Sequence, residues 1–167
     1  MAGRLLLAIV LLVAACGGDD EPTRAEQARQ LARDAGLPAD VQEWLVLAAG
    51  DPDADYRVAY GELVVTQEDG ERRIDAGEGG EAAMAADPGG FDPAAVEGLV
   101  DRLRAARDGH AFAVENRRML GVTARCLVTA PKRGSGTSGV FCVSDQGAIL
   151  LLQGANGDLR ATEYEYR

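Results

Sequence analysis

The first sixteen residues contain the longest unbroken hydrophobic run of the chain. Arg4 precedes the run, Leu5–Val13 are all apolar, and the small residues Ala14 and Ala15 follow. One positive charge, a short apolar core and small residues before a cleavage point are typical of a secretory signal peptide. The run is too short to span a bilayer as a helix. This pattern predicts a signal peptide over residues 1–15.

Two segments after the signal peptide have the spacing of helices. Thr23 and Glu26 form a capping box that opens a helix running to Ala35, where Gly36 stops it. A second helix is expected after Pro38. Its apolar face consists of Val41, Trp44, Leu45 and Ala48.

A third helix has the strongest signals in the chain. Asp92 is placed as its N-cap, Pro93 as its first residue and Gly109 as its stop. Its apolar stripe consists of Val96, Leu99, Val100 and Leu103. A single helix of this kind among strands usually covers a sheet, so we expect it to be the main covering helix.

The remaining segments alternate with a period of two and predict strands. An antiparallel hairpin is expected from Tyr56 to Ala76, or a meander if Gly61 breaks the first strand. Residues 77–90 are interpreted as a long surface loop or one poor strand. The last third is predicted to be nearly all strand: Phe112–Met119, Val122–Ala130, Gly139–Ser144, Ala148–Gln153 and Leu159–Tyr166. Asn156-Gly157 is the strongest two-residue turn signal. We therefore expect one α+β domain over residues 23–167, with an antiparallel sheet and one or two N-terminal helices.

Charge limits the classes of partner. The chain has 167 residues and a formal net charge of -10, and removal of residues 1–15 removes only the charge of Arg4. Nucleic-acid binding requires a basic field, and attraction to anionic headgroups does too, so both are disfavoured. Sixteen arginines against the single Lys132 suggest a GC-rich bacterial genome.

Two cysteines remain beside Cys16. In an exported chain, Cys126 and Cys142 are expected to form one disulfide. A zinc or redox pair would have closer spacing or histidine neighbours. If Val122–Ala130 pairs with Gly139–Ser144, the two cysteines lie about equally far from the loop centre. The disulfide should then join neighbouring strands of that hairpin, or lie close to it.

Other candidate chemistry is weak. Asp51, Asp53, Asp55 and Glu62 match calcium-loop positions, but Tyr56 replaces the required glycine and a strand follows where a helix is needed. His110, the only histidine, is more typical of a loop near a helix end than of a catalytic base. The glycine string of residues 134–139 enters a strand rather than a helix, and no G-x-S-x-G or H-E-x-x-H motif is present. We therefore expect no enzyme, no catalytic residue, no cofactor and no metal.

Val13-Ala14-Ala15-Cys16 resembles the lipobox of bacterial lipoproteins. The resemblance implies cleavage before Cys16, acylation of its sulfur, and a new N-terminus there. Two or three acyl chains give a firm anchor, whereas one gives marginal binding. Residues 16–22 would then be the acylated cysteine and a flexible leash, and the domain would be exported and held on the outer face of the cell membrane.

A second resemblance involves most of residues 39–167. Residues 39–49, Tyr56–Tyr60, Gly121–Cys126, Gly139–Gly147 and Leu159–Glu163 are similar to a group of small actinobacterial lipoproteins. Their pattern resembles the LolA, LppX and LprG type of carrier, a curved antiparallel half-barrel with helices at its mouth. The resemblance implies binding or transfer of an envelope lipid and no catalysis. Residues 77–90 depart from it, because they replace strands that would line the cavity.

Seven apolar residues are candidates for lining such a cavity: Tyr56, Val58, Tyr60, Val96, Leu99, Val100 and Leu103. All of them serve equally well as an ordinary core. Two functions therefore remain open. One is a tethered carrier with a hydrophobic ligand; the other is a tethered, non-enzymatic interaction or sensor domain without a cavity, whose protein partner is unknown.

Overall fold

The structure, a computed structural model, describes residues 22–77, 93–134, 136–154 and 157–167. Within them the chain is α+β, with three helices and two antiparallel sheets. The helices are α1 (Arg24–Asp34), α2 (Ala39–Ala48) and α4 (Pro93–Ala106). The strands are β1 (Tyr56–Tyr60), β2 (Leu63–Glu68), β3 (Glu71–Asp75), β4 (His110–Met119), β5 (Val122–Pro131), β6 (Gly139–Val143), β7 (Ile149–Gly154), β8 (Gly157–Arg160) and β9 (Glu163–Tyr166).

The helices begin where the local chemistry predicts. Thr23 Oγ1 accepts a hydrogen bond from the Glu26 backbone N–H at 3.3 Å, and the Glu26 carboxylate accepts one from the Thr23 N–H at 2.9 Å. This reciprocal pair satisfies two N–H groups that the first turn leaves without helical partners. The capping box and the buried face of α2 are therefore confirmed.

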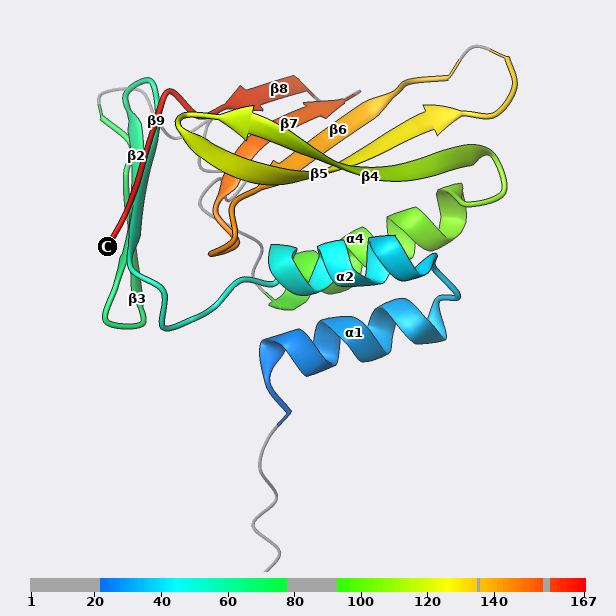
Figure 1. Ribbon diagram of the computed structural model, residues 1–167, viewed down its shortest axis with the longest axis horizontal. Coiled ribbons are helices and arrows are strands. Elements are labelled where there is room, and N and C mark those ends of the chain that lie inside the picture. Colours follow the sequence, from blue (N-terminus) through cyan, green and yellow to red (C-terminus); the bar gives the residue numbers. More distant parts are fainter. Residues whose placement is uncertain (1–21, 78–92, 135, 155–156) are drawn as a thin grey trace, which may run out of the picture.

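Two sheets divide the strands. A small sheet has the order β3-β2-β1-β9, and a large sheet has the order β4-β5-β6-β7-β8. All neighbouring strands in both sheets are antiparallel. Figure 1 shows the small sheet standing at one end of the large sheet, with the helices along the lower face of the large one.

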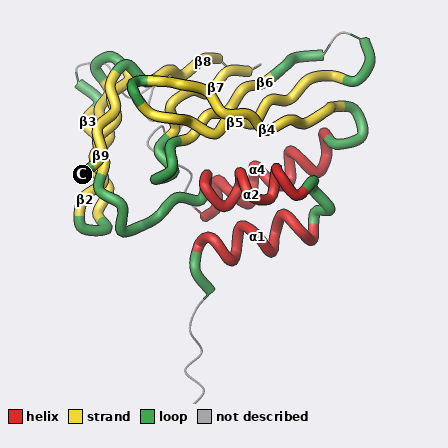
Figure 2. Tube along the Cα trace, viewed as in Figure 1, coloured by secondary structure: helices red, strands yellow, loops and turns green. Residues whose placement is uncertain are grey.

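Helices cover one face of the large sheet. On that face, α2 and α4 lie between the sheet and α1 (Figure 2). The helix-side core consists of Ala32, Ala35, Leu37, Val41, Trp44, Leu45, Ala48, Leu99, Val100, Leu103, Leu127, Val143 and Ile149. Trp44 fastens α2 to the sheet, because its Nε1 donates to the Arg125 carbonyl at 3.0 Å.

The opposite face of the large sheet meets the small sheet. Their inter-sheet core consists of Tyr56, Val58, Val65, Ala124, Cys126, Cys142, Ala148, Leu150, Leu151, Ala161 and Tyr164. A bulge in β7 helps to fill both cores: Cys142 pairs with Leu151 and Val143 with Ile149, so Leu150 is the extra residue. The bulge lets Ile149 face the helices while Leu150 and Leu151 face the small sheet.

The expectation of one strand over Leu159–Tyr166 is wrong. The chain leaves the large sheet after β8 and joins the small sheet as β9. At the crossing, the Ala161 N–H donates to the Leu150 carbonyl at 2.9 Å, and the Thr162 N–H donates to the Ala59 carbonyl at 2.7 Å. These two hydrogen bonds hold consecutive residues to different sheets, which alternation along a sequence cannot reveal.

Splitting of the strands also changes the predicted architecture. We expected one sheet under one main helix, whereas the described residues form two sheets, and both α2 and α4 pack on the large one. The physical reason for a second covering helix is that α2 contributes four fully buried apolar residues to the helix-side core, whereas α4 contributes three.

Several expectations fall outside the described residues. These are the signal peptide, Cys16, the leash up to residue 21, most of the loop over residues 77–90, and Asn156 of the predicted turn. Gly154 pairs with Gly157, the residues at the adjoining ends of β7 and β8. No helix among the described residues is long and apolar enough to cross a membrane.

Candidate functional site

The three β1 candidates for a ligand cavity lie in the inter-sheet core. Tyr56, Val58 and Tyr60 alternate onto the face of the small sheet that meets the large sheet. Tyr56 packs against Tyr164 with ring centroids 6.4 Å apart, and the Tyr60 hydroxyl donates to the Ile149 carbonyl. Each of these side chains therefore has core neighbours or a polar partner.

The four α4 candidates lie elsewhere. Leu99, Val100 and Leu103 are in the helix-side core, and Val96 packs with Ala28 and Ala49 in a small third cluster. Exposure of all four side chains is 4% or less. The seven predicted lining residues are thus divided among three clusters on opposite faces of the large sheet, and the structure does not bring them together.

Three pockets formed by the described residues are small. One has a volume of about 60 Å³, and the other two have about 20 Å³ each. Pockets for drug-sized ligands usually hold about 300–1,000 Å³. None of these three reaches the size that an acyl chain requires.

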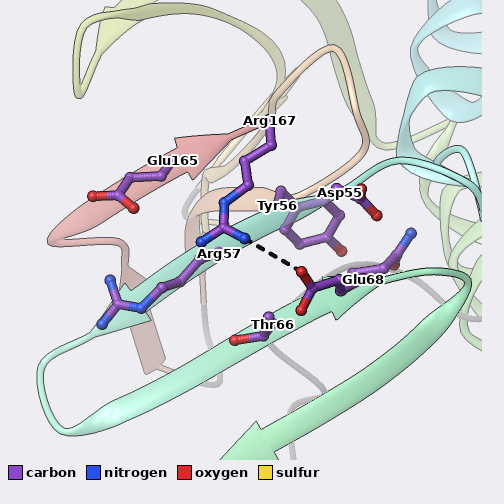
Figure 3. A pocket seen from close by; sticks show the side chains of 8 residues that line it. Asp55, Tyr56, Arg57, Thr66, Glu68, Glu165 and Arg167 are labelled. Carbon is purple, nitrogen blue, oxygen red and sulfur yellow. Dashed lines mark hydrogen bonds and ion pairs between the residues drawn. The ribbon is translucent and has the colours of Figure 1, made fainter.

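The pocket of about 60 Å³ lies on the outer face of the small sheet (Figure 3). Arg57, Thr66 and Glu165 are directly opposite one another on β1, β2 and β9. An ion pair of 3.3 Å joins Arg167 to Glu68 across this face, and another of 2.9 Å joins Arg57 to Glu163. Because these side chains are exposed, the pairs contribute little stability. The arrangement is a charged, solvated sheet face.

A buried polar cluster lies at the β6–β7 turn, and no motif in the sequence marks it. Ser144, 1% exposed, accepts hydrogen bonds at its Oγ from the backbone N–H groups of Gln146 and Ala148. The Tyr164 hydroxyl lies 3.0 Å from this Oγ and 2.6 Å from the Gln146 side-chain oxygen. Burial raises the pKa of Tyr164, and the charge of Asp145 adds to the rise, against the hydrogen bond to Ser144. The cluster fastens β9 to the turn through a neutral phenol.

The predicted disulfide between Cys126 and Cys142 is confirmed. The two residues are directly opposite on β5 and β6, with Cα atoms 4.0 Å apart, and neither is exposed. Cys126 is four residues from Val122, whose pair with Met119 closes the β4–β5 turn, so the backbone groups of Cys126 bond to β4. On the β6 side, Cys126 and Cys142 are therefore a non-hydrogen-bonded pair, in which opposite side chains come closest. The bond therefore joins neighbouring strands of the expected hairpin.

The other sequence candidates are separated in space. Strand β1 lies between Asp55 and Glu62, so about 17 Å of extended chain divides the last acidic position of the calcium-like pattern from the three before it. Among the described residues, no three His, Cys, Asp or Glu side chains are grouped to hold a metal ion. His110 begins β4 rather than lying in a loop, and the glycine string enters β6 as expected.

Comparison with known proteins adds little. No protein-family model matches the chain, and no curated protein does. A solved structure described as the crystal structure of MucB aligns with 77% of this chain at 17% identity and a TM-score of 0.40. The aligned region covers 59% of the MucB chain, less than two thirds of its length. A likeness of this size assigns no function.

Proposed function

We propose that the chain is an exported lipoprotein that displays a non-enzymatic interaction domain on the outer face of the cell membrane. Residues 1–15 are its signal peptide, and Cys16 is its acylated N-terminus. Gly17–Pro22 form the leash, and the folded domain begins at Thr23. The charged, apolar and small residues before Cys16 support the anchor.

The disulfide supports the exported location. Disulfides persist in oxidising compartments and are rare in the cytosol of most organisms. Cys126 and Cys142 are buried in the inter-sheet core, where their bond joins β5 to β6 within the large sheet. A pair of this kind is typical of a structural disulfide in a secreted domain.

The observation that carries the interaction function is the packing of the seven lining candidates. A half-barrel carrier is the competing proposal, and it requires the face of the large sheet toward the helices to hold an acyl chain. Trp44, Leu103 and Ile149 occupy that space, with exposures of 0%, 4% and 1%. We infer that the domain acts through its surface.

The anchor is tested by changing Cys16 to Ala in the full chain. The wild-type chain is expected to incorporate a labelled fatty acid and to sediment with membranes, and Cys16→Ala should lose the label and keep its signal peptide. Gly18→Ala, two residues later, serves as the matched control and should behave as wild type. A fatty acid label that remains in Cys16→Ala would overturn the proposed anchor.

Lipid carriage is tested by native mass spectrometry of the full chain after mixing with vesicles of envelope lipids. We expect no stoichiometric lipid beyond the covalent acyl groups. One bound lipid per wild-type chain would overturn the interaction proposal in favour of a carrier. Trp44→Ala is the control, because it opens space in the helix-side core. Lipid bound by this variant alone would show entry into a loosened protein and not into a cavity of the wild type.

A further inference from the structure

Strand β4 is a long free edge of the large sheet. It spans ten residues, pairs with β5 along its whole length, and has no other strand beside it among the described residues. Natural edges are usually blunted by shortness, proline, bulges or charge. Strand β4 contains no proline and no bulge, and its charged residues are confined to Glu115, Arg117 and Arg118 beyond the initial His110.

The β4–β5 turn determines which backbone groups point outward. Met119 pairs with Val122 around Leu120 and Gly121, whose φ angles of 49° and 84° are those of a type I′ turn. The closing pair of such a hairpin is hydrogen-bonded, so Met119 and every second residue before it bond to β5. The backbone groups of the alternate residues face away: Phe112, Val114, Asn116 and Arg118. Within the described chain they make no backbone hydrogen bond to another segment.

Charges on this edge are self-complementary. Glu115 and Arg117 lie on the same face of β4, in contact with each other, with side-chain exposures of 47% and 39%. An antiparallel copy of β4 centred on Asn116 places Glu115 opposite Arg117 of the second copy, twice by symmetry. If the two copies were centred on Glu115 or on Arg117, like charges would lie opposite each other. If they were centred on Val114, both charged residues would lie opposite alanines.

We propose that the β4 edges of two copies of this chain pair in antiparallel orientation about Asn116, so that both large sheets become one continuous sheet. The register supplies about six backbone hydrogen bonds, from Val114, Asn116 and Arg118 of each copy. Two cross-strand ion pairs select it over the neighbouring registers. A shared membrane anchor raises the effective concentration of the two edges.

This dimer rests on the proposed function, because it gives the interaction domain a partner. The pairing itself does not need the anchor, because every contact lies within the folded domain. Loss of acylation at Cys16 and loss of β4 pairing are therefore separate results, obtained with separate variants. An unrelated protein strand on the same edge is the alternative occupant. It would leave two copies of this chain without contact.

Cross-linking across the twofold axis tests the register. In the full chain, Asn116→Cys brings two introduced cysteines to a Cα separation of about 5.5 Å, within the range of a disulfide. Arg118→Cys is the matched control on the same exposed face, because its two copies are separated by about 13 Å along the strands. We expect a mild oxidant to produce covalent dimers of the Asn116 variant in large excess over the control. Wild type reports the background that does not come from an introduced cysteine.

Charge reversal tests the ion pairs in the same assay. In the Asn116→Cys chain, Glu115→Arg should lower the cross-linked fraction roughly tenfold, because arginines then face each other. Addition of Arg117→Glu should restore it. Circular dichroism and an intact buried disulfide show that each variant is folded. Equal cross-linking in the Asn116 and Arg118 variants, or no rescue by the double reversal, would overturn the proposal.

Discussion

At the scale of single residues, the least expected group is the phenol of Tyr164. It is 9% exposed and lies beside Ser144 Oγ and Gln146 Oε1, so one hydroxyl links β9 to the β6–β7 turn. Nothing in the sequence distinguishes Tyr164 from Tyr166, two residues later on the same strand. Tyr166 is 60% exposed. The two side chains point to the same face of β9, so alternation along the strand does not separate them. Only the position of the β6–β7 turn beside Tyr164 decides which tyrosine is structural.

Tyr164→Phe is expected to lower the free energy of unfolding by about 1 kcal/mol near neutral pH, because the hydroxyl's hydrogen bonds are lost. Burial raises the pKa of Tyr164 in the folded state, so above the ordinary tyrosine pKa of about 10 the unfolded state loses its proton first. Wild-type stability should therefore fall as the pH rises through that range, and the advantage over Tyr164→Phe should shrink. Urea unfolding at a series of pH values measures both effects.

Tyr166→Phe is the control for this prediction, since it removes a hydroxyl from an exposed ring on the same strand. Its stability should match that of the wild type within about 0.5 kcal/mol. A Tyr164→Phe chain as stable as the Tyr166→Phe chain at neutral pH would show that the buried cluster does not hold β9.

At the scale of elements, the tightest contact joins the β6–β7 turn to the end of α2. Gly147 has a φ of 86°, and a Cβ placed on it would lie 2.3 Å from the Gly50 Cα and 2.9 Å from the Leu47 carbonyl oxygen. Backbone atoms on both sides leave no flexible group to move. The turn therefore requires glycine for space as well as for its conformation.

Gly147→Ala tests this contact against Gly121→Ala. Gly121 has nearly the same φ, 84°, but nothing lies within 4 Å of its added Cβ. We expect Gly121→Ala to cost about 1–2 kcal/mol from the left-handed backbone alone. Gly147→Ala should cost about 1–3 kcal/mol more, because it also overpacks the interface. Thermal or urea unfolding measures the difference, and equal losses would mean that the α2 end simply shifts away.

At the scale of the whole molecule, β9 joins the two sheets into one cooperative structure. It covers the free side of β1 and buries Tyr164 among residues of both sheets. A chain truncated after Arg160 should lose at least about 3 kcal/mol of unfolding free energy, the scale of one deleted core aromatic. Denaturant unfolding should become less cooperative, because the small sheet loses its edge.

Removal of Arg167 alone is the control for that truncation. Its side chain is 77% exposed and pairs with Glu68 on the surface, so the loss should stay within about 1 kcal/mol. If truncation after Arg160 had no larger effect than removal of Arg167, the large sheet would fold independently of the small one.

Most local features could be predicted from the sequence. Capping by Thr23 and Glu26, the apolar face of α2, the hairpin strands and the Cys126–Cys142 pair all depend on neighbours close along the chain, or on one register across a hairpin. Spacing and turn chemistry determine such features directly. These parts of the fold agree with the expectations.

The tertiary structure alone decided the rest. Alternation shows that a strand has two faces but not which sheet it joins, so the crossing at Ala161 and Thr162 was read as one strand. An apolar residue that lines a cavity and one that fills a core also look the same in sequence, and only packing placed Tyr56 and Leu103 in separate cores. The free edge of β4 likewise exists only because β5 is the one strand of the described residues that lies beside it. The physical reason is that these features depend on contacts between segments far apart in the sequence. The burial that specifies such contacts cannot be assigned to any single segment.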